Sequence, residues 1–178
     1  MLAKRTLALL PASLLALLVS TAAGSAEVTA KITDVHLCCK SCVTGVEKAI
    51  AEVPDAKAAV DQEAGTVTLS GPDKETVKKA AGVLVKAGYF GKTGDSGIKL
   101  EANTGAKSKT VQSMTIEDVH LCCPKCVKAV DKAVKTVPGV KEQTATKGAK
   151  SFQVTGDFNE KDVMTALQEA GLTGKVGK

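Results

Sequence analysis

Apolar residues recur along this chain in two matching series, one in each half. Each series begins with apolar positions at helical spacing (i, i+3, i+7) that stop at a proline, which is typical of an amphipathic helix with one buried face. The positions are Val43, Val46, Ile50 and Val53 before Pro54, and Val127, Val130, Val134 and Val137 before Pro138. The pattern predicts one such helix in each half.

Alternation of apolar and polar residues predicts four short strands in each half, because a period of two is typical of a half-buried strand. The predicted strands lie near residues 28–32, 56–60, 66–70 and 90–93, and near 114–116, 140, 151–155 and 172–176. Turns containing Gly65 and Gly148 separate the second and third strands of each set.

A second helix is predicted in each half between the third and fourth strands. Asp73 and Asn159 are suited to cap these helices at their N-termini, and Gly88 and Gly171 follow their C-terminal ends. The inner faces carry Val77, Ala80, Ala81 and Leu84, and Val163, Ala166, Leu167 and Ala170.

The order strand–helix–strand–strand–helix–strand therefore occurs twice. This βαββαβ order predicts an α+β chain of two tandem ferredoxin-like domains, each an antiparallel sheet with two helices on one face. We place the domains at 27–95 and 110–178, joined by a linker at 96–109 that is rich in Gly, Ser, Thr, Asn and Lys. An alternative is that Ile98 and Leu100 extend the last strand of the first domain.

The N-terminus predicts export. Residues 1–26 combine Lys4 and Arg5, a short apolar run and small residues ending at Ala26, as a cleaved signal peptide does. The mature protein is then expected in the periplasm or secreted, as a monomer without stable membrane insertion. Cleavage removes two basic residues and no acid, so the net charge falls from +5 to +3. With few aromatic residues and no basic patch, nucleic-acid binding is not expected.

All six cysteines and both histidines lie in two copies of one heptapeptide, 84 positions apart. The copies are His36-Leu37-Cys38-Cys39-Lys40-Ser41-Cys42 and His120-Leu121-Cys122-Cys123-Pro124-Lys125-Cys126. A disulfide within either trio would close a very small loop and leave one thiol unpaired, so a structural disulfide framework is disfavoured. The doubled motif indicates a duplicated thiolate site.

Each motif falls between the first predicted strand and the first predicted helix. Backbone N–H groups at a helix start favour the thiolate form, which is the form that binds metal. Soft sulfur ligands select Cu(I), Zn(II) and heavier thiophilic ions. Pro124 suits a first helical turn.

A C-x-x-C pair at the start of the first helix of a βαββαβ unit resembles the heavy-metal-associated domain family, which includes copper chaperones, modules of metal-transporting ATPases and the periplasmic mercury-binding protein. The resemblance covers most of 27–95 and 110–178, and includes the Gly88-Tyr89 pair. It implies that Cys39 and Cys42, and in the second copy Cys123 and Cys126, bind the metal.

The chain differs from the family motif Gly-Met-x-Cys-x-x-Cys at its first two positions and has a cysteine at the variable third position. Leu37 and Leu121 replace the methionine and should still anchor the loop in the core. Cys38 and Cys122 offer a third thiolate, which requires the loop to curl because neighbouring side chains diverge in an extended segment. His36 and His120 either supply a nitrogen ligand, as in a Cys₃His zinc site, or order the loop. We expect them to order the loop, with His36 pointing away from the thiols.

The function expected from this resemblance is that of a non-catalytic metallochaperone or heavy-metal scavenger. It would bind Cu(I) first, with Hg(II) or Zn(II) as alternatives, and pass the ion by ligand exchange to a metal-transporting membrane protein or another carrier. A thiol–disulfide oxidoreductase using the same pairs is the alternative, although the strand order and the absence of Trp fit it poorly. An interaction module with incidental metal binding is a third interpretation. The sequence leaves open whether the two domains hold two ions or share one.

Overall fold

The computed structural model describes residues 26–94 and 97–177. The predicted signal peptide at 1–26 therefore lies, except for Ala26, outside the described residues. Within the described part of the chain, every helix is too short or too polar to cross a bilayer.

Unit one, residues 28–93, has the predicted βαββαβ order. Its elements are β1 (Val28–Thr33), α1 (Lys40–Ile50), β2 (Lys57–Asp61), β3 (Thr66–Gly71), α2 (Lys74–Lys86) and β4 (Lys92–Thr93). The strands form an antiparallel sheet in the order β2-β3-β1-β4, in which Ile32 of β1 pairs with Val67 of β3. β1 is an inner strand with β3 on one side and β4 on the other. The loop between β1 and α1 therefore starts from the middle of the sheet and not from an edge strand.

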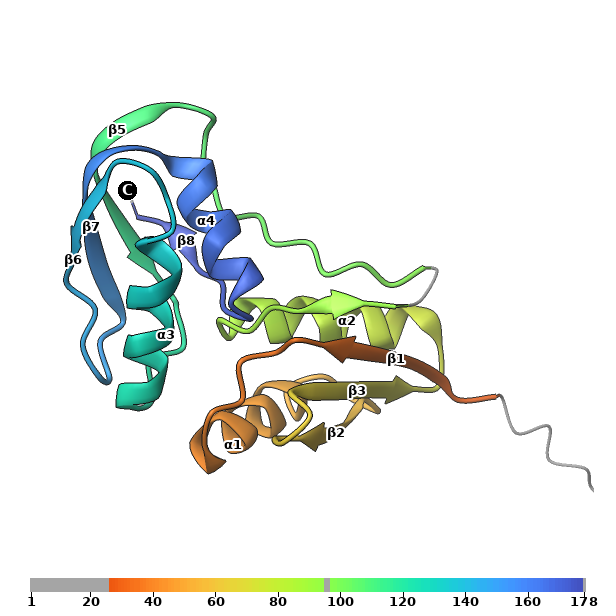
Figure 1. The fold of residues 1–178 in the computed structure, drawn as a ribbon. Coiled ribbons are helices and arrows are strands. Elements are labelled where there is room, and N and C mark those ends of the chain that lie inside the picture. Colours follow the sequence, from red (N-terminus) through yellow and green to blue (C-terminus); the bar gives the residue numbers. More distant parts are fainter. Residues whose placement is uncertain (1–25, 95–96, 178) are drawn as a thin grey trace, which may run out of the picture.

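Unit two, residues 110–176, repeats this topology. Its elements are β5 (Thr110–Glu117), α3 (Pro124–Val134), β6 (Val140–Gln143), β7 (Ser151–Asn159), α4 (Glu160–Glu169) and β8 (Lys175–Val176). The strand order β6-β7-β5-β8 matches that of unit one (Figure 1). Ile116 of β5 pairs with Phe152 of β7. The predicted fold class is thus confirmed: two ferredoxin-like units in tandem.

The predicted helix caps are present in both units. The Asp73 side chain accepts a hydrogen bond from Thr76 N at 2.7 Å, and that of Asn159 accepts one from Lys161 N at 3.0 Å. These bonds satisfy N–H groups that a helix start otherwise leaves without partners. The capped helices bury apolar side chains against the sheet, including Leu84 and Leu167, both fully buried.

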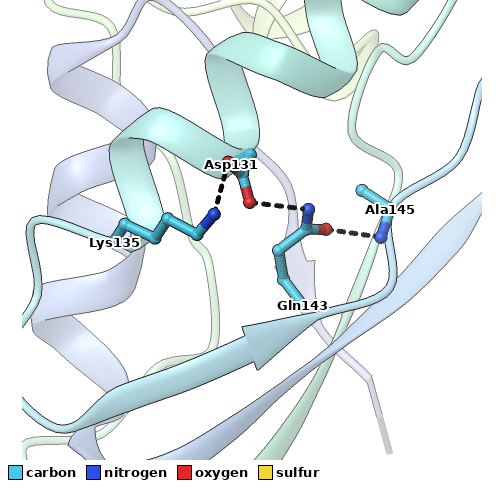
Figure 2. A network of polar contacts seen from close by, with 4 residues as sticks. All are labelled: Asp131, Lys135, Gln143 and Ala145. Atoms are coloured by element: carbon cyan, nitrogen blue, oxygen red, sulfur yellow. Dashed lines mark hydrogen bonds and ion pairs between the residues drawn. The ribbon is translucent and has the colours of Figure 1, made fainter.

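A small polar network fastens α3 to the strand beside it (Figure 2). Asp131 accepts hydrogen bonds from Lys135 at 2.8 Å and from Gln143 at 3.1 Å, and Gln143 in turn accepts one from Ala145 N. The lysine and the amide together lower the pKa of the Asp131 carboxyl. The network fixes the end of α3 opposite its cysteines.

The connection between the units runs alongside α2 as an extended segment (Figure 1). β4 ends at Thr93, so Ile98 and Leu100 are not part of that strand, although Ile98 is buried. Near unit two, the buried Glu160 accepts a hydrogen bond from Lys107 N at 2.9 Å and pairs with Lys109 at 3.1 Å. The described linker residues are therefore attached to the units at both ends, while the domain limits at 95 and 110 stay predictions.

The two units meet through the turns that follow α2 and α4. Thr173 N donates to Gly88 O at 3.0 Å and Phe90 N donates to Gly171 O at 3.2 Å, while Tyr89 and Leu172 face each other in an antiparallel bridge. Both glycines have positive φ, +87° and +78°. The contact is reciprocal, because equivalent turns of the two units pair with each other.

Each of these glycines also lies against the loop after the first strand of the other unit. A Cβ on Gly88 would lie 2.6 Å from Asp118 O and 2.6 Å from His120 N, and one on Gly171 would meet Asp34 O and His36 N. Only glycine allows this approach, both for space and for its left-handed backbone.

Replacing Gly88 by alanine should therefore separate the units while leaving each one folded. We expect the midpoint of urea unfolding to fall by the equivalent of about 1–2 kcal/mol from the backbone conformation alone, and the radius of gyration from small-angle scattering to rise.

Gly82 in α2 supplies the matched control, since a Cβ there would have no atom within 4 Å. Gly82→Ala should leave the radius unchanged and add about 0.5–1 kcal/mol of stability, as alanine replaces glycine in a helix interior. Equal scattering profiles for Gly88→Ala and Gly82→Ala would contradict the proposed role of Gly88.

Candidate metal centre

The two cysteine loops, residues 36–42 and 120–126, lead from the first strand of each unit into its first helix. Cys39 and Cys123 are the N-caps of α1 and α3, with extended backbones and no side-chain cap bond. Cys42 and Cys126 lie in the first helical turn and are fully buried. Burial of the leucine that precedes each trio anchors the loops in the core as predicted, and Pro124 begins α3.

The loops approach each other so closely that cysteines of different units are in contact. The Sγ atom of Cys38 lies 3.3 Å from that of Cys123 and 3.5 Å from that of Cys126. By the near-symmetry of the units, Cys122 Sγ lies 3.6 Å from Cys39 Sγ and 3.4 Å from Cys42 Sγ. All six candidate ligands predicted from the sequence are therefore brought to one place.

These four contacts between the units are shorter than the contacts within each unit, whereas the fifth contact between the units, Cys42 with Cys126, is longer. The C-x-x-C pairs have Sγ–Sγ distances of 3.8 Å in unit one and 3.9 Å in unit two, and Cys42 lies 4.0 Å from Cys126. All six cysteines are free thiols, since a disulfide requires about 2.05 Å.

Several groups of three donors are close enough to hold one ion, with all ligand atoms of a group within 4.8 Å of one another. The groups are Cys38, Cys39 and Cys123; Cys39, Cys42 and Cys122; Cys122, Cys123 and Cys126; and His36, Cys38 and Cys126. Cys38 and Cys39 thus share a triad, which the loop makes possible by curling. Three of these groups combine residues of both units, so the site belongs to the pair rather than to either unit.

The buried thiols at the centre do not ionise equally. A hydrogen bond from the Cys126 thiol, together with His120, lowers the pKa of Cys42 to about 2, while the same bond to Cys42 and burial raise the pKa of Cys126. The Cys42 sulfur therefore ionises in preference to that of Cys126.

The half-buried thiols Cys38 and Cys123 also differ in pKa. Burial raises the pKa of Cys123, but hydrogen bonds from Cys126 N and the Cys38 thiol outweigh it and bring the pKa to about 6. Burial and the hydrogen bond to Cys123 raise the pKa of Cys38 to about 12. Helix-start N–H groups thus favour the thiolate at Cys123, as the sequence predicted.

The two histidines have different surroundings. His120 Nε2 lies 3.0 Å from the hydroxyl of Tyr89, which donates to Cys42 O at 2.9 Å, and the two rings are 4.6 Å apart. Tyr89 therefore joins the helix start of unit one to the loop of unit two, and His120 orders the loop as predicted. Gly45 leaves room for the hydroxyl.

His36 has no such partner, because Leu172 occupies the position equivalent to Tyr89. Its Nε2 is buried without a hydrogen bond, and a ring nitrogen lies within 4.8 Å of the sulfurs of Cys38 and Cys126. The expectation that His36 points away from the thiols is therefore wrong. Burial lowers the pKa of His36, which keeps the ring neutral and able to act as a ligand at pH 7.

Tyr89, Leu172 and the two turn glycines are the residues of this centre that the sequence reasoning did not place there. Their matching positions after the second helix of each repeat are the signal that the sequence carries. That signal does not by itself reveal that the turns contact the opposite unit.

The pKa difference between Cys123 and Cys38 predicts the order in which an alkylating reagent modifies them. Cys123 should react with iodoacetamide first and remain reactive down to about pH 6, where half of it is thiolate, whereas Cys38 should react slowly throughout. Peptide mass spectrometry of the reduced, metal-free protein between pH 5 and 8 gives the site-resolved rates. Faster labelling of Cys38 at pH 6 would contradict the assignment.

Tyr89→Phe should weaken the contact between the units, because it removes a buried hydroxyl that bonds to Cys42 O and His120. We expect a loss of about 1–3 kcal/mol in unfolding free energy, measured by urea denaturation. Phe90→Leu, at the neighbouring half-buried position, is the control and should cost less. A loss no larger for Tyr89→Phe than for Phe90→Leu would show that the hydroxyl is not part of the contact.

The chain has a relative among characterised proteins. It is 31% identical over 140 residues to "Copper-transporting ATPase 2" of Rhizobium meliloti (strain 1021). The match covers 75% of this chain but only 14% of that protein, so the chain spans about one-seventh of its relative's length. No family model matches the chain.

The chain is also similar to solved structures of domains from other proteins. The N-terminal domain of PacS from Synechocystis PCC6803 is 20% identical (TM-score 0.34; 38% of this chain, 100% of that one). The apo HMA domain of the copper chaperone for superoxide dismutase is 20% identical (TM-score 0.35; 49% and 86%). The N-terminal soluble domains of Bacillus subtilis CopA are 16% identical (TM-score 0.33; 86% and 95%).

The sequence relationship, the strand order of both units and the position of each C-x-x-C pair at a helix start agree with one another. The cluster of thiols and the relationship together support a role in metal binding. The resemblance of both units to heavy-metal-associated domains is thereby confirmed.

Proposed function

We propose that this protein is an exported metallochaperone or scavenger that binds soft metal ions through its two cysteine loops and transfers them by ligand exchange. The observation that carries the proposal is the convergence of six cysteine sulfurs, with neighbours 3.3–4.0 Å apart. Thiolates bind Cu(I), Zn(II) and heavier thiophilic ions in preference to Mg²⁺ or Ca²⁺. Cu(I) is the first candidate, supported by the copper transport named for the related ATPase.

The exposure of the thiols fits transfer to another carrier. Cys42 and Cys126 are buried, while Cys38, Cys39, Cys122 and Cys123 are half-buried. Thiols of a partner could attack an ion from the half-buried side while the inner sulfurs still hold it. We propose a metal-transporting membrane protein or a second metal carrier as that partner, and the periplasm or the extracellular space as the place of transfer.

Anaerobic titration of the reduced protein with Cu(I), buffered by a chromophoric Cu(I) chelator, tests this function. The wild type should withdraw Cu(I) from the chelator, whereas Cys39→Ser combined with Cys123→Ser should lose at least tenfold in affinity, because each C-x-x-C pair then lacks one sulfur. Ser41→Ala changes an exposed residue between the two cysteines of unit one and should bind as the wild type does.

Failure of Cu(I), Hg(II) and Zn(II) alike to bind, or undiminished binding by the double variant, would overturn the proposal. A disulfide-reductase assay at catalytic protein concentrations separates the oxidoreductase alternative, which predicts turnover without metal. A count of free thiols on protein taken from its native compartment shows whether the cysteines are available for metal.

A further inference from the structure

We propose that the two cysteine loops hold one tetranuclear cluster of monovalent thiophilic ions, Cu(I) above all, in which every cysteine sulfur bridges two ions. This inference rests on the proposed function and specifies its site: the loops form one shared cluster instead of two mononuclear C-x-x-C sites.

The six sulfurs lie at the corners of a distorted octahedron. Nine Sγ–Sγ separations fall between 3.3 and 4.0 Å. Three more pairs lie within 4.8 Å as members of one triad. Three pairs of these described cysteines share neither a contact nor a triad, namely Cys38 with Cys122, Cys39 with Cys126, and Cys42 with Cys123. Each sulfur thus has four neighbours and one opposite, which defines an octahedron.

Four of the triangular faces of this octahedron can be chosen so that they share corners but no edges. Three are the all-cysteine triads, and the fourth joins Cys38, Cys42 and Cys126, whose sulfurs are 3.5, 3.7 and 4.0 Å apart. Every cysteine belongs to two of the four faces. The faces are 38/39/123, 39/42/122, 122/123/126 and 38/42/126. One ion on each face therefore receives three sulfurs, and each sulfur serves two ions.

The charge of such a cluster favours monovalent ions. Four singly charged ions and six thiolates leave a net charge of −2. The N-termini of α1 and α3, both helices of 11 residues, begin at the cluster, and their positive ends stabilise residual negative charge. Four Zn(II) ions would leave a charge of +2 and would lack the fourth ligand that tetrahedral zinc requires.

Independent mononuclear sites fit the geometry less well. Cys38 and Cys122 lie nearer to cysteines of the opposite unit than to those of their own, at 3.3–3.6 Å against 3.7 Å. Six thiolates at these distances repel one another strongly unless cations lie between them. One ion in each unit would leave the contacts between the units without a bridging cation.

The test is the Cu(I) content of the full chain, loaded anaerobically with a reductant present and passed through a desalting column. Elemental analysis should give four Cu per chain, and X-ray absorption should show three sulfurs around each Cu together with Cu–Cu scattering. Two Cu per chain without Cu–Cu scattering would overturn the cluster while leaving the proposed function intact. Absence of bound Cu would also overturn the cluster, and if Hg(II) and Zn(II) fail to bind as well, the proposed function itself is overturned.

Two variants distinguish the shared cluster from two separate mononuclear sites: one removes sulfurs and the other separates the units. Cys38→Ser combined with Cys122→Ser takes one sulfur from every face of the set, so the content should fall from four Cu to two or fewer. Gly88→Ala keeps all six thiols but should separate the units, with the same fall to two. Far-ultraviolet circular dichroism checks that the units stay folded, and the matched control Gly82→Ala should retain four Cu. Four Cu in either the double variant or a separated Gly88→Ala would contradict the shared cluster.

Discussion

The contact on which the rest of this structure depends is the reciprocal docking of two glycine turns. Gly88 and Gly171 each lie against the backbone of the opposite cysteine loop, at distances that leave no room for a side chain. Backbone hydrogen bonds between the turns hold this arrangement. Because each loop is positioned by the other unit, the sulfurs come within 3.3–4.0 Å of one another. The centre is therefore a product of docking as much as of the two individual folds.

Bringing six thiols together has an electrostatic cost that the protein meets in two ways. In the metal-free state, protons stay on some sulfurs, since burial raises the pKa of Cys38 and the hydrogen bond to Cys42 raises that of Cys126. In the metal-loaded state that we propose, metal ions take the place of those protons. Close packing of the sulfurs disfavours the ionisation of several thiols at once, and for the same reason a cation placed among them is strongly stabilising. Metal binding and proton release are therefore coupled.

The sequence predicted the interior of each unit well because its patterns are local. The caps at Asp73 and Asn159, the buried helix faces and the alternating strands follow from spacing alone. The arrangement of the units was not predictable in this way, because no periodicity records which surface meets which. His36 shows the consequence: judged by strand alternation it should point away from its own thiols, yet docking brings sulfurs of both units to it. The roles of the six cysteines as ligands remain predictions.

The linker gives this arrangement a further property. Lys107 and Lys109 bind the linker to Glu160, and the linker residue Ile98 is buried in the core. Because the linker joins the two units covalently, the second unit cannot diffuse away from the first. For tethered partners the effective concentration is on the order of millimolar. A separate single-unit carrier would have to find a second copy before six sulfurs could meet, and would lose the assembly on dilution. In the tandem chain, assembly is a first-order event, independent of how scarce the protein is.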